Sequence, residues 1–123
     1  MSLKTFDKIN CIKNLNKNSA NPFIIFKDNK EIYYSNKVFK NLFFKNKMIN
    51  NNNIFDFLAI NTKNDRHLLS RINFFKFVNK TIIVEFINYS HENLLFNMII
   101  NYIGQYNKIK YYYSNLINLN PVK

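Results

Sequence analysis

Apolar residues near the start of the chain recur at every third position: Leu3, Phe6, Ile9, Ile12 and Leu15. This spacing predicts a helix over residues 3 to about 18. Because a helix has about 3.6 residues per turn, the apolar positions wind around its axis instead of forming one straight stripe. Such a helix is marginal alone and needs a surface to pack on. Polar residues 14–21 predict a linker that Pro22 closes.

The residues after Pro22 favour β-structure. Phe23 to Phe26 form a wholly apolar run, and residues 31–34 read as the returning strand after a turn at residues 27–30. Ser35 or Asn36 then supplies an N-cap oxygen for a helix. The predicted helix carries four apolar side chains on one face: Val38, Phe39, Leu42 and Phe43.

The middle of the chain alternates between a polar stretch and short apolar segments. Residues 45–53 are rich in Asn and Lys and predict a loop. Asn side chains form hydrogen bonds with nearby backbone groups in competition with secondary structure, and they supply no apolar surface for a core. Residues 54–58 predict a short helical turn. Asp65 to about Ile72 predicts a second short helix, with Asp65 at the end where a carboxylate is favoured.

The second half predicts three strands, at residues 74–78, 81–89 and 94–103. A polar turn that contains His91 separates the last two. These strands carry apolar groups on both faces, so the sheet must be covered on both. The middle helices cover one face; the N-terminal helix, the C-terminal segment or a second chain covers the other. Residues 105–123 have a roughly helical apolar period and predict a docking helix.

The order of these elements, together with two segments, resembles a PAS domain over about residues 20–104. Residues 28–43, DNKEIYYSNKVFKNLF, look like the family's common opening, and residues 54–58 look like the aromatic and acidic segment that follows. The resemblance implies an α+β fold, a five-stranded antiparallel sheet with short helices on one face and an N-terminal helix. The chain then divides into residues 1–20, a PAS-like domain at 21–104, and the segment 105–123.

Within this family the chain looks most like the N-terminal sensory domains of bacterial transcription activators, of the conjugation-transfer and PAS-LuxR types. The likeness lies in the Asn21-Pro22 entry to the first strand and in the turn with His91. It implies a sensory and dimerisation domain. Residues 105–123 are too short for a helix-turn-helix, so DNA would be contacted only through a domain outside this chain.

The composition leaves one alternative open. The chain of 123 residues carries a net charge of +11, which fits a small basic protein that binds nucleic acid. However, Lys outnumbers Arg 16 to 2, and Asn, Ile, Phe and Tyr are also abundant, as A/T-rich codons would give. A solvated surface with dispersed lysines is therefore the favoured interpretation, since base recognition relies on Arg.

Candidate chemistry is sparse. The chain has a single Gly, no phosphate-binding loop, no metal-ligand spacing and no paired acids, so we expect no enzyme and no resident cofactor or metal. Some PAS domains bind haem, and the resemblance implies His67 as the only candidate axial ligand, which would make the chain a haem or metabolite sensor; the alternative is a surface histidine beside Asp65 and Arg66. Glu85 is an isolated charge in an apolar strand; an edge-strand gatekeeper is the favoured interpretation, ahead of a buried partner for a Lys or a ligand contact. Cys11 is the single cysteine, which favours a reducing, cytoplasmic location.

Two sets of residues are candidates for binding. A small apolar ligand between sheet and helices would be walled by seven side chains: Phe26, Phe39, Phe43, Phe57, Leu68, Phe96 and Met98. The same residues would make an ordinary filled core. A homodimer would use the N-terminal helix through Leu3, Phe6, Ile9 and Ile12. The longest apolar run has four residues, so we expect no membrane partner.

Overall fold

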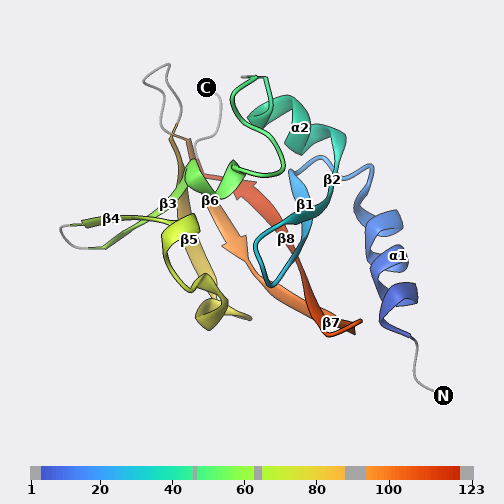
Figure 1. The fold of residues 1–123 in the computed structure, drawn as a ribbon. Coiled ribbons are helices and arrows are strands. Elements are labelled where there is room, and N and C mark those ends of the chain that lie inside the picture. The colour runs from blue at the N-terminus through green and yellow to red at the C-terminus, as the bar shows by residue number, and fades with distance from the viewer. Residues whose placement is uncertain (1–3, 46, 63–64, 88–93, 120–123) are drawn as a thin grey trace.

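The computed structural model describes residues 4–45, 47–62, 65–87 and 94–119 (Figure 1). The helices are α1 (Thr5–Asn16) and α2 (Lys37–Phe43), and three 3₁₀ turns are η1 (Ile54–Asp56), η2 (Leu69–Arg71) and η3 (Phe74–Phe77). The strands are β1 (Phe23–Lys27), β2 (Ile32–Ser35), β3 (Leu58–Thr62), β4 (Asp65–Leu68), β5 (Thr81–Phe86), β6 (Leu94–Ile99), β7 (Asn101–Tyr106) and β8 (Ile109–Asn118). The fold class is therefore α+β, as predicted.

The eight strands form one antiparallel sheet in the order β2-β1-β8-β6-β5-β3-β4, and β7 also pairs with β8. The register between β6 and β8 continues unchanged into β7, from Phe96 opposite Asn118 to Tyr102 opposite Tyr112. Together, β6 and β7 act as one long strand along β8. The single strand expected over residues 94–103 is thus divided into β6 and β7, which follow β8 in one register.

The two faces of the sheet have separate cores. On the inner face, α2 and the 3₁₀ turns bury Phe39, Phe43 and Phe74 against sheet residues such as Phe26 and Phe96. On the outer face, α1 buries Ile9 against Phe23, Ile25, Ile103 and Tyr111. A sheet that is apolar on both faces is thus covered on both, although α1 covers the part formed by β1, β2, β7 and β8 and not β5 or β6.

The C-terminal segment departs most from the sequence prediction. Residues 109–118 are not a helix; they form β8, the longest strand, which lies between β1 and β6 near the middle of the sheet. Asn107 and Lys108 make the tight turn that reverses the chain, with φ values of 51° and 64°. The boundary expected at residue 104 therefore falls inside β7.

Three shorter predictions are also wrong. Residues 74–78 form η3 and not a strand, and residues 65–72 form β4 followed by η2 and not a helix. Leu58, expected in a helical turn, begins β3 after η1 ends. The sheet consequently has eight strands where five were expected. The periodicity of a short apolar run does not distinguish a strand from a helix. Whether the run becomes a strand depends on whether a neighbouring strand is available to pair with it.

The elements as far as α2 agree with the prediction. The helix at residues 3–18 is α1, the hairpin is β1–β2, and α2 begins directly after Asn36. The candidate Leu3 and the turn residue His91 lie outside the described residues. In the part of the chain that the structure describes, no helix has the length and hydropathy needed to cross a membrane.

Candidate functional site

The side chain of Asn36 joins four segments of the chain. Its Oδ1 accepts hydrogen bonds from the backbone N–H of Phe23 (3.1 Å) and of Phe39 (2.9 Å), which caps α2. Its Nδ2 donates to the carbonyls of Asn21 (3.0 Å) and Asn16 (3.4 Å). Asn36 is fully buried. One amide therefore connects the start of α2 on the inner face with the end of α1 on the outer face.

The packing of α1 depends on the only glycine in the chain. A Cβ at Gly104 of β7 would lie 2.7 Å from Oγ1 of Thr5, the first residue of α1. No side chain could be added there without moving Thr5, so glycine permits the helix to approach the sheet closely. The Asn115 amide also reaches Oδ1 of Asn16 at 3.4 Å, at the other end of α1.

The residues predicted for a dimer contact divide between the two sides of α1. Ile9 is buried against the chain's own sheet, and Ile12 packs against the same cluster half-buried. Phe6 is 46% exposed and packs beside Tyr106, with the ring centroids 6.0 Å apart. Of these residues, Phe6 has the side chain that a partner could reach with α1 in this position.

The seven candidates for an apolar ligand pocket do not all come together. Phe26, Phe39, Phe43, Phe96 and Met98 are buried in the inner core, and Phe57 packs against it half-buried. The rings are close: Phe39 to Phe43 is 4.5 Å and Phe43 to Phe96 is 5.6 Å between centroids. Leu68 instead lies opposite Ala59 and faces the outer side of the sheet.

A groove of about 390 Å³ runs beside α2, between the α1–β1 linker and the ends of β6 and β8. Its apolar wall consists of Ala20, Pro22, Val38, Leu42 and Phe96. Its polar rim consists of Asn21, Asn41, Lys45 and Asn118. Val38 and Leu42 are four residues apart and therefore share one side of α2, next to the buried side that carries Phe39 and Phe43.

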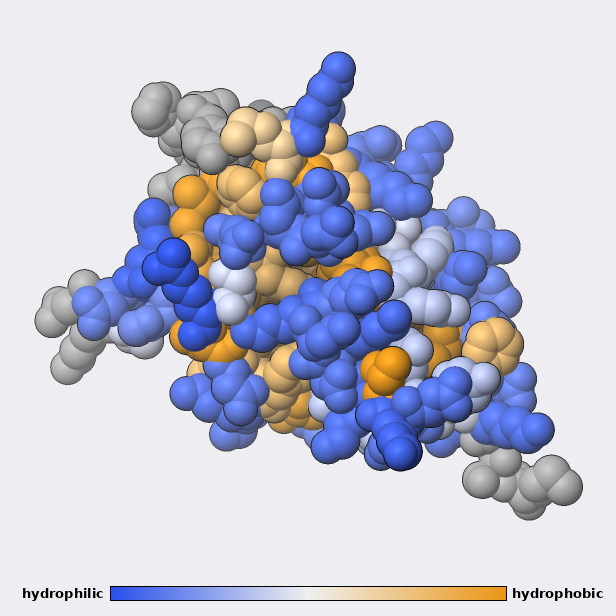
Figure 2. Space-filling view, in the orientation of Figure 1, coloured by the Kyte–Doolittle hydropathy of each residue, from blue (hydrophilic) through white to orange (hydrophobic). Residues whose placement is uncertain are grey.

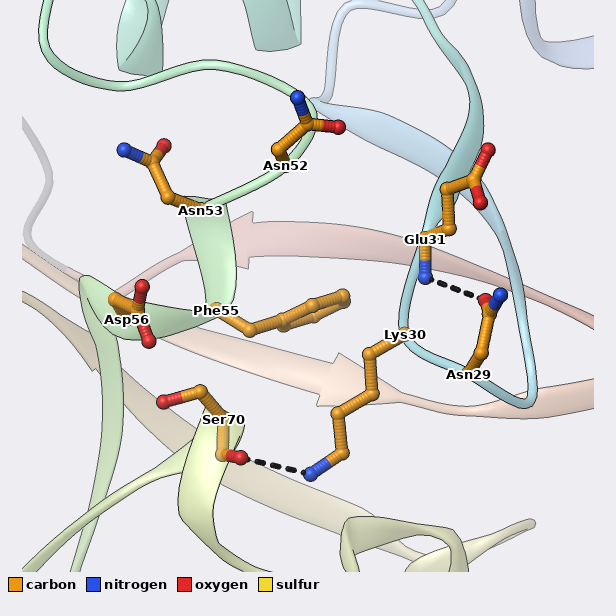
Figure 3. A pocket seen from close by; sticks show the side chains of 8 residues that line it. All are labelled: Asn29, Lys30, Glu31, Asn52, Asn53, Phe55, Asp56 and Ser70. Atoms are coloured by element: carbon orange, nitrogen blue, oxygen red, sulfur yellow. Dashed lines mark hydrogen bonds between the residues drawn. The ribbon is translucent and has the colours of Figure 1, made fainter.

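A second hollow, of about 350 Å³, lies between the β1–β2 turn, η1 and η2 and has a polar lining (Figure 3). Lys30 lines it, and its Nζ donates to the carbonyls of Leu69 (3.1 Å), Ser70 (3.1 Å) and Ile72 (2.7 Å). Burial lowers the pKa of Lys30 from its ordinary value. Lys30 has a φ of 72°, in the left-handed region that few residues other than glycine adopt. The contacts give Lys30 a structural role as a clamp between the turn and η2.

His67 lies on the edge strand β4 and not in a helix as predicted. It is half-buried, and its Nε2 is 3.4 Å from Oγ1 of Thr62. Its side chain shares the inner face with Ile60, which lies opposite it on β3. A role as haem ligand stays a prediction.

Glu85 is not on an edge strand, because β5 pairs with both β3 and β6. The gatekeeper interpretation is therefore wrong. Its carboxylate is buried and lies 2.6 Å from a guanidinium nitrogen of Arg66 on the edge strand β4. The ion pair offsets the cost of burying this charge and ties the edge hairpin to the sheet.

Part of the outer face carries exposed apolar side chains beyond the reach of α1. Ile83, Ile99 and Ile117 are 56%, 41% and 50% exposed, and we call them the outer patch. The sheet register places Asn97 between Ile83 and Ile117. A shallow hollow of about 320 Å³ lies among Asn97, Ile99, Ile117 and their neighbours. Elsewhere, on the near face in Figure 2, hydrophilic residues cover most of the surface, with hydrophobic residues visible between them.

Sequence reasoning missed the groove rim and the Lys30 clamp. In the sequence, Lys45 falls in a polar loop and Lys30 in a turn, and neither position predicts a contact. A lysine in a turn gives no signal of a carbonyl partner about 40 positions away. For the groove, the sequence contains part of the signal: Val38 and Leu42 lie on an apolar helix face, but Pro22 predicts only the end of a linker.

No protein-family model and no curated protein sequence matches the chain. Among solved structures, it is similar to the PAS domain of an HTR-like protein from Haloarcula marismortui, with 8% identity, a TM-score of 0.60 and 93% of each chain covered. It is also similar to a PAS domain from a two-component sensor histidine kinase, with 9% identity, a TM-score of 0.52, and 94% of this chain and 99% of that chain covered. With the inner and outer cores described above, these similarities show that the chain has the fold of a PAS domain.

Proposed function

We propose that the chain is a non-catalytic, PAS-type sensory domain of a bacterial signalling or transcription-regulating protein, and that it acts as a homodimer in the cytoplasm. The observation that carries the proposal is the fold, which is shared over 93% of the chain with the PAS domain of an HTR-like protein. The second similar structure comes from a sensor histidine kinase. In this proposal, the domain binds a ligand or a partner, and the binding shifts the elements that flank the sheet.

In this proposal, the contacts of Asn36 transmit a structural change from one face of the sheet to the other. A ligand or partner that displaces α2 on the inner face changes the position of Asn36, which caps that helix. Asn36 also holds the carbonyl of Asn16 at the end of α1. A change on the inner face therefore alters the support of α1 on the outer face, where a second subunit can respond.

The outer patch supports a second copy of the chain as the partner. Its three isoleucines lie on β5, β6 and β8, so a partner would cover adjacent strands of one sheet. A self-complementary contact is the usual form of a homodimer, and amides such as Asn97 could pair across it. Exposed apolar side chains grouped in this way are typical of interaction surfaces.

Substitution of the outer patch tests the dimer. Ile83→Asp and Ile117→Asp should each convert the dimer to a monomer, because a carboxylate would be buried in an apolar contact. The measurement is sedimentation equilibrium, with circular dichroism to verify that each variant is folded. Met48→Asp is the matched control, since Met48 is 63% exposed and lies in the loop after α2. A dimer that persists in both folded patch variants contradicts the proposed interface.

A further inference from the structure

We infer that the groove beside α2 binds a small amphipathic carboxylate, a compound with one carboxylate group and an apolar chain or ring. The inference deepens the proposed sensory function and rests on it for its biological meaning. It concerns the space between the α1–β1 linker, α2 and the ends of β6 and β8. The buried inner core lies behind it.

The apolar wall of the groove favours a ligand with an apolar chain or ring. Val38 and Leu42 are half-buried on one side of α2, and Pro22 and Phe96 face the same space from the linker and β6. Small-molecule sites typically combine an apolar wall with a few polar groups that fix orientation. An alkyl chain or an aromatic ring would exclude water from this wall, which is the main favourable contribution to binding.

The rim of the groove selects an anion. Lys45 is the charged residue among the described residues that line it, and the amides of Asn21 and Asn41 can donate hydrogen bonds beside it. Across the described residues, no acidic side chain forms an ion pair with Lys45. The net charge of +11 adds a favourable long-range potential for an anion. A single ammonium with neutral donors suits a monocarboxylate better than a doubly charged phosphate.

The volume of the groove limits the size of the ligand. At about 30 Å³ for each water in the liquid, 390 Å³ corresponds to on the order of ten to thirteen water molecules. Octanoate, with ten non-hydrogen atoms, is a suitable probe of this size, and octanamide is its uncharged counterpart.

The position of the groove connects binding with the proposed route of signalling. Asn21 and Pro22 belong to the segment between α1 and β1, and the carbonyl of Asn21 accepts a hydrogen bond from Asn36. The carbonyl of Pro22 accepts one from the backbone N–H of Leu116 on β8. A ligand in the groove therefore contacts both the linker that carries α1 and the helix that Asn36 caps.

Titration of the ¹⁵N-labelled chain with octanoate, followed by ¹H–¹⁵N correlation spectra, tests the inference. Saturable shifts should be confined to residues around Pro22, Leu42 and Phe96 at octanoate concentrations up to about 5 mM, a range suited to a small ligand. Lys45→Gln should weaken octanoate about threefold, as expected for an exposed ion pair, and leave octanamide unchanged. Lys40→Gln is the matched control, because Lys40 is exposed on α2 but does not line the groove.

Two results would overturn the inference: no saturable shifts, or dispersed shifts that Lys40→Gln and Lys45→Gln reduce equally, which indicates non-specific attraction to a basic protein. Leu42→Asn provides a second variant and should weaken octanoate and octanamide alike. The dimer is measured separately. If octanoate fails to bind while the outer-patch variants still dissociate, only the ligand inference fails; if octanoate binds and those variants stay dimeric, the proposed interface fails.

Discussion

The side chain of Asn36 uses both of its amide hydrogens and both lone-pair directions of its oxygen. Each of the four contacts reaches a different backbone group, at Phe23, Phe39, Asn21 and Asn16. Because the side chain is buried, any contact that is lost leaves a polar group without water. This one residue therefore contributes to the start of β1, the start of α2 and the end of α1 together.

Asn36→Asp separates the two sides of this network. The carboxylate keeps the acceptor for Phe23 and Phe39 but faces the carbonyls of Asn21 and Asn16 with an oxygen in place of the NH₂ group. We expect the free energy of unfolding to fall by about 2–3 kcal/mol. Urea denaturation measures this, with Asn14→Asp on the exposed side of α1 as the control. A loss equal to that of the control would show that the Nδ2 contacts contribute nothing.

Tyr112 predicts how stability depends on alkaline pH. Burial raises the pKa of its hydroxyl above the usual 10.0, and the charges of Asp28 and ionised Tyr102 add to this effect. In the unfolded chain the tyrosine ionises near pH 10, while in the folded chain it stays protonated, so the unfolded state binds fewer protons. Stability should therefore fall as pH rises above about 10.

The contribution of Tyr112 is obtained by difference, because pH effects common to both proteins then cancel. Tyr112→Phe should lose less stability than the natural chain between about pH 9.5 and pH 11. Thermal unfolding at a series of pH values gives the two slopes. Parallel slopes for the two proteins would contradict the assignment.

At the level of elements, the β7–β8 hairpin organises the sheet, since β8 pairs with β1, β6 and β7. Its two-residue turn has positive φ at both Asn107 and Lys108, the conformation of a type I′ turn. Asn tolerates this region well, whereas Lys does so at a cost. The sequence therefore carries a weaker form of the favoured Asn-Gly turn.

Lys108→Gly should raise the free energy of unfolding by about 0.5–1 kcal/mol, because glycine adopts the left-handed conformation without strain. Lys110→Gly is the control and should lower stability, since residue 110 lies within β8 opposite Gln105. Both are measured by thermal or urea unfolding. Equal destabilisation by the two substitutions would contradict the turn assignment.

The sequence predicted β1, β2, α2 and the existence of α1, because each has a clear pattern and a turn or cap at its ends. It failed for β8. Tyr111 and Tyr113 face α1's side of the sheet while Tyr112 and Leu116 face the inner core, so both faces are apolar and the alternation is hidden. The turn before β8 contains no glycine, so the sequence does not indicate a hairpin there. Only its pairing with three other strands distinguishes this segment from a helix.

For the whole molecule, the apolar character of both sheet faces was the most informative feature of the sequence. It predicted a covering layer on each side, and α1 and α2 provide these layers. Five of the predicted pocket residues lie together in the inner core for the same reason. The groove could be predicted only in part and the outer patch not at all, because they depend on where α1 ends and on how far β8 extends past it.

Native mass spectrometry of the unmodified chain tests the central claim most directly, because a sensory domain that signals through a second subunit must associate with itself. The account predicts a major species at twice the chain mass of 14.9 kDa at micromolar concentration, which the outer-patch variants reduce to a single chain. A single-chain mass at every concentration up to about 100 µM, well above the range of specific dimers, would contradict it.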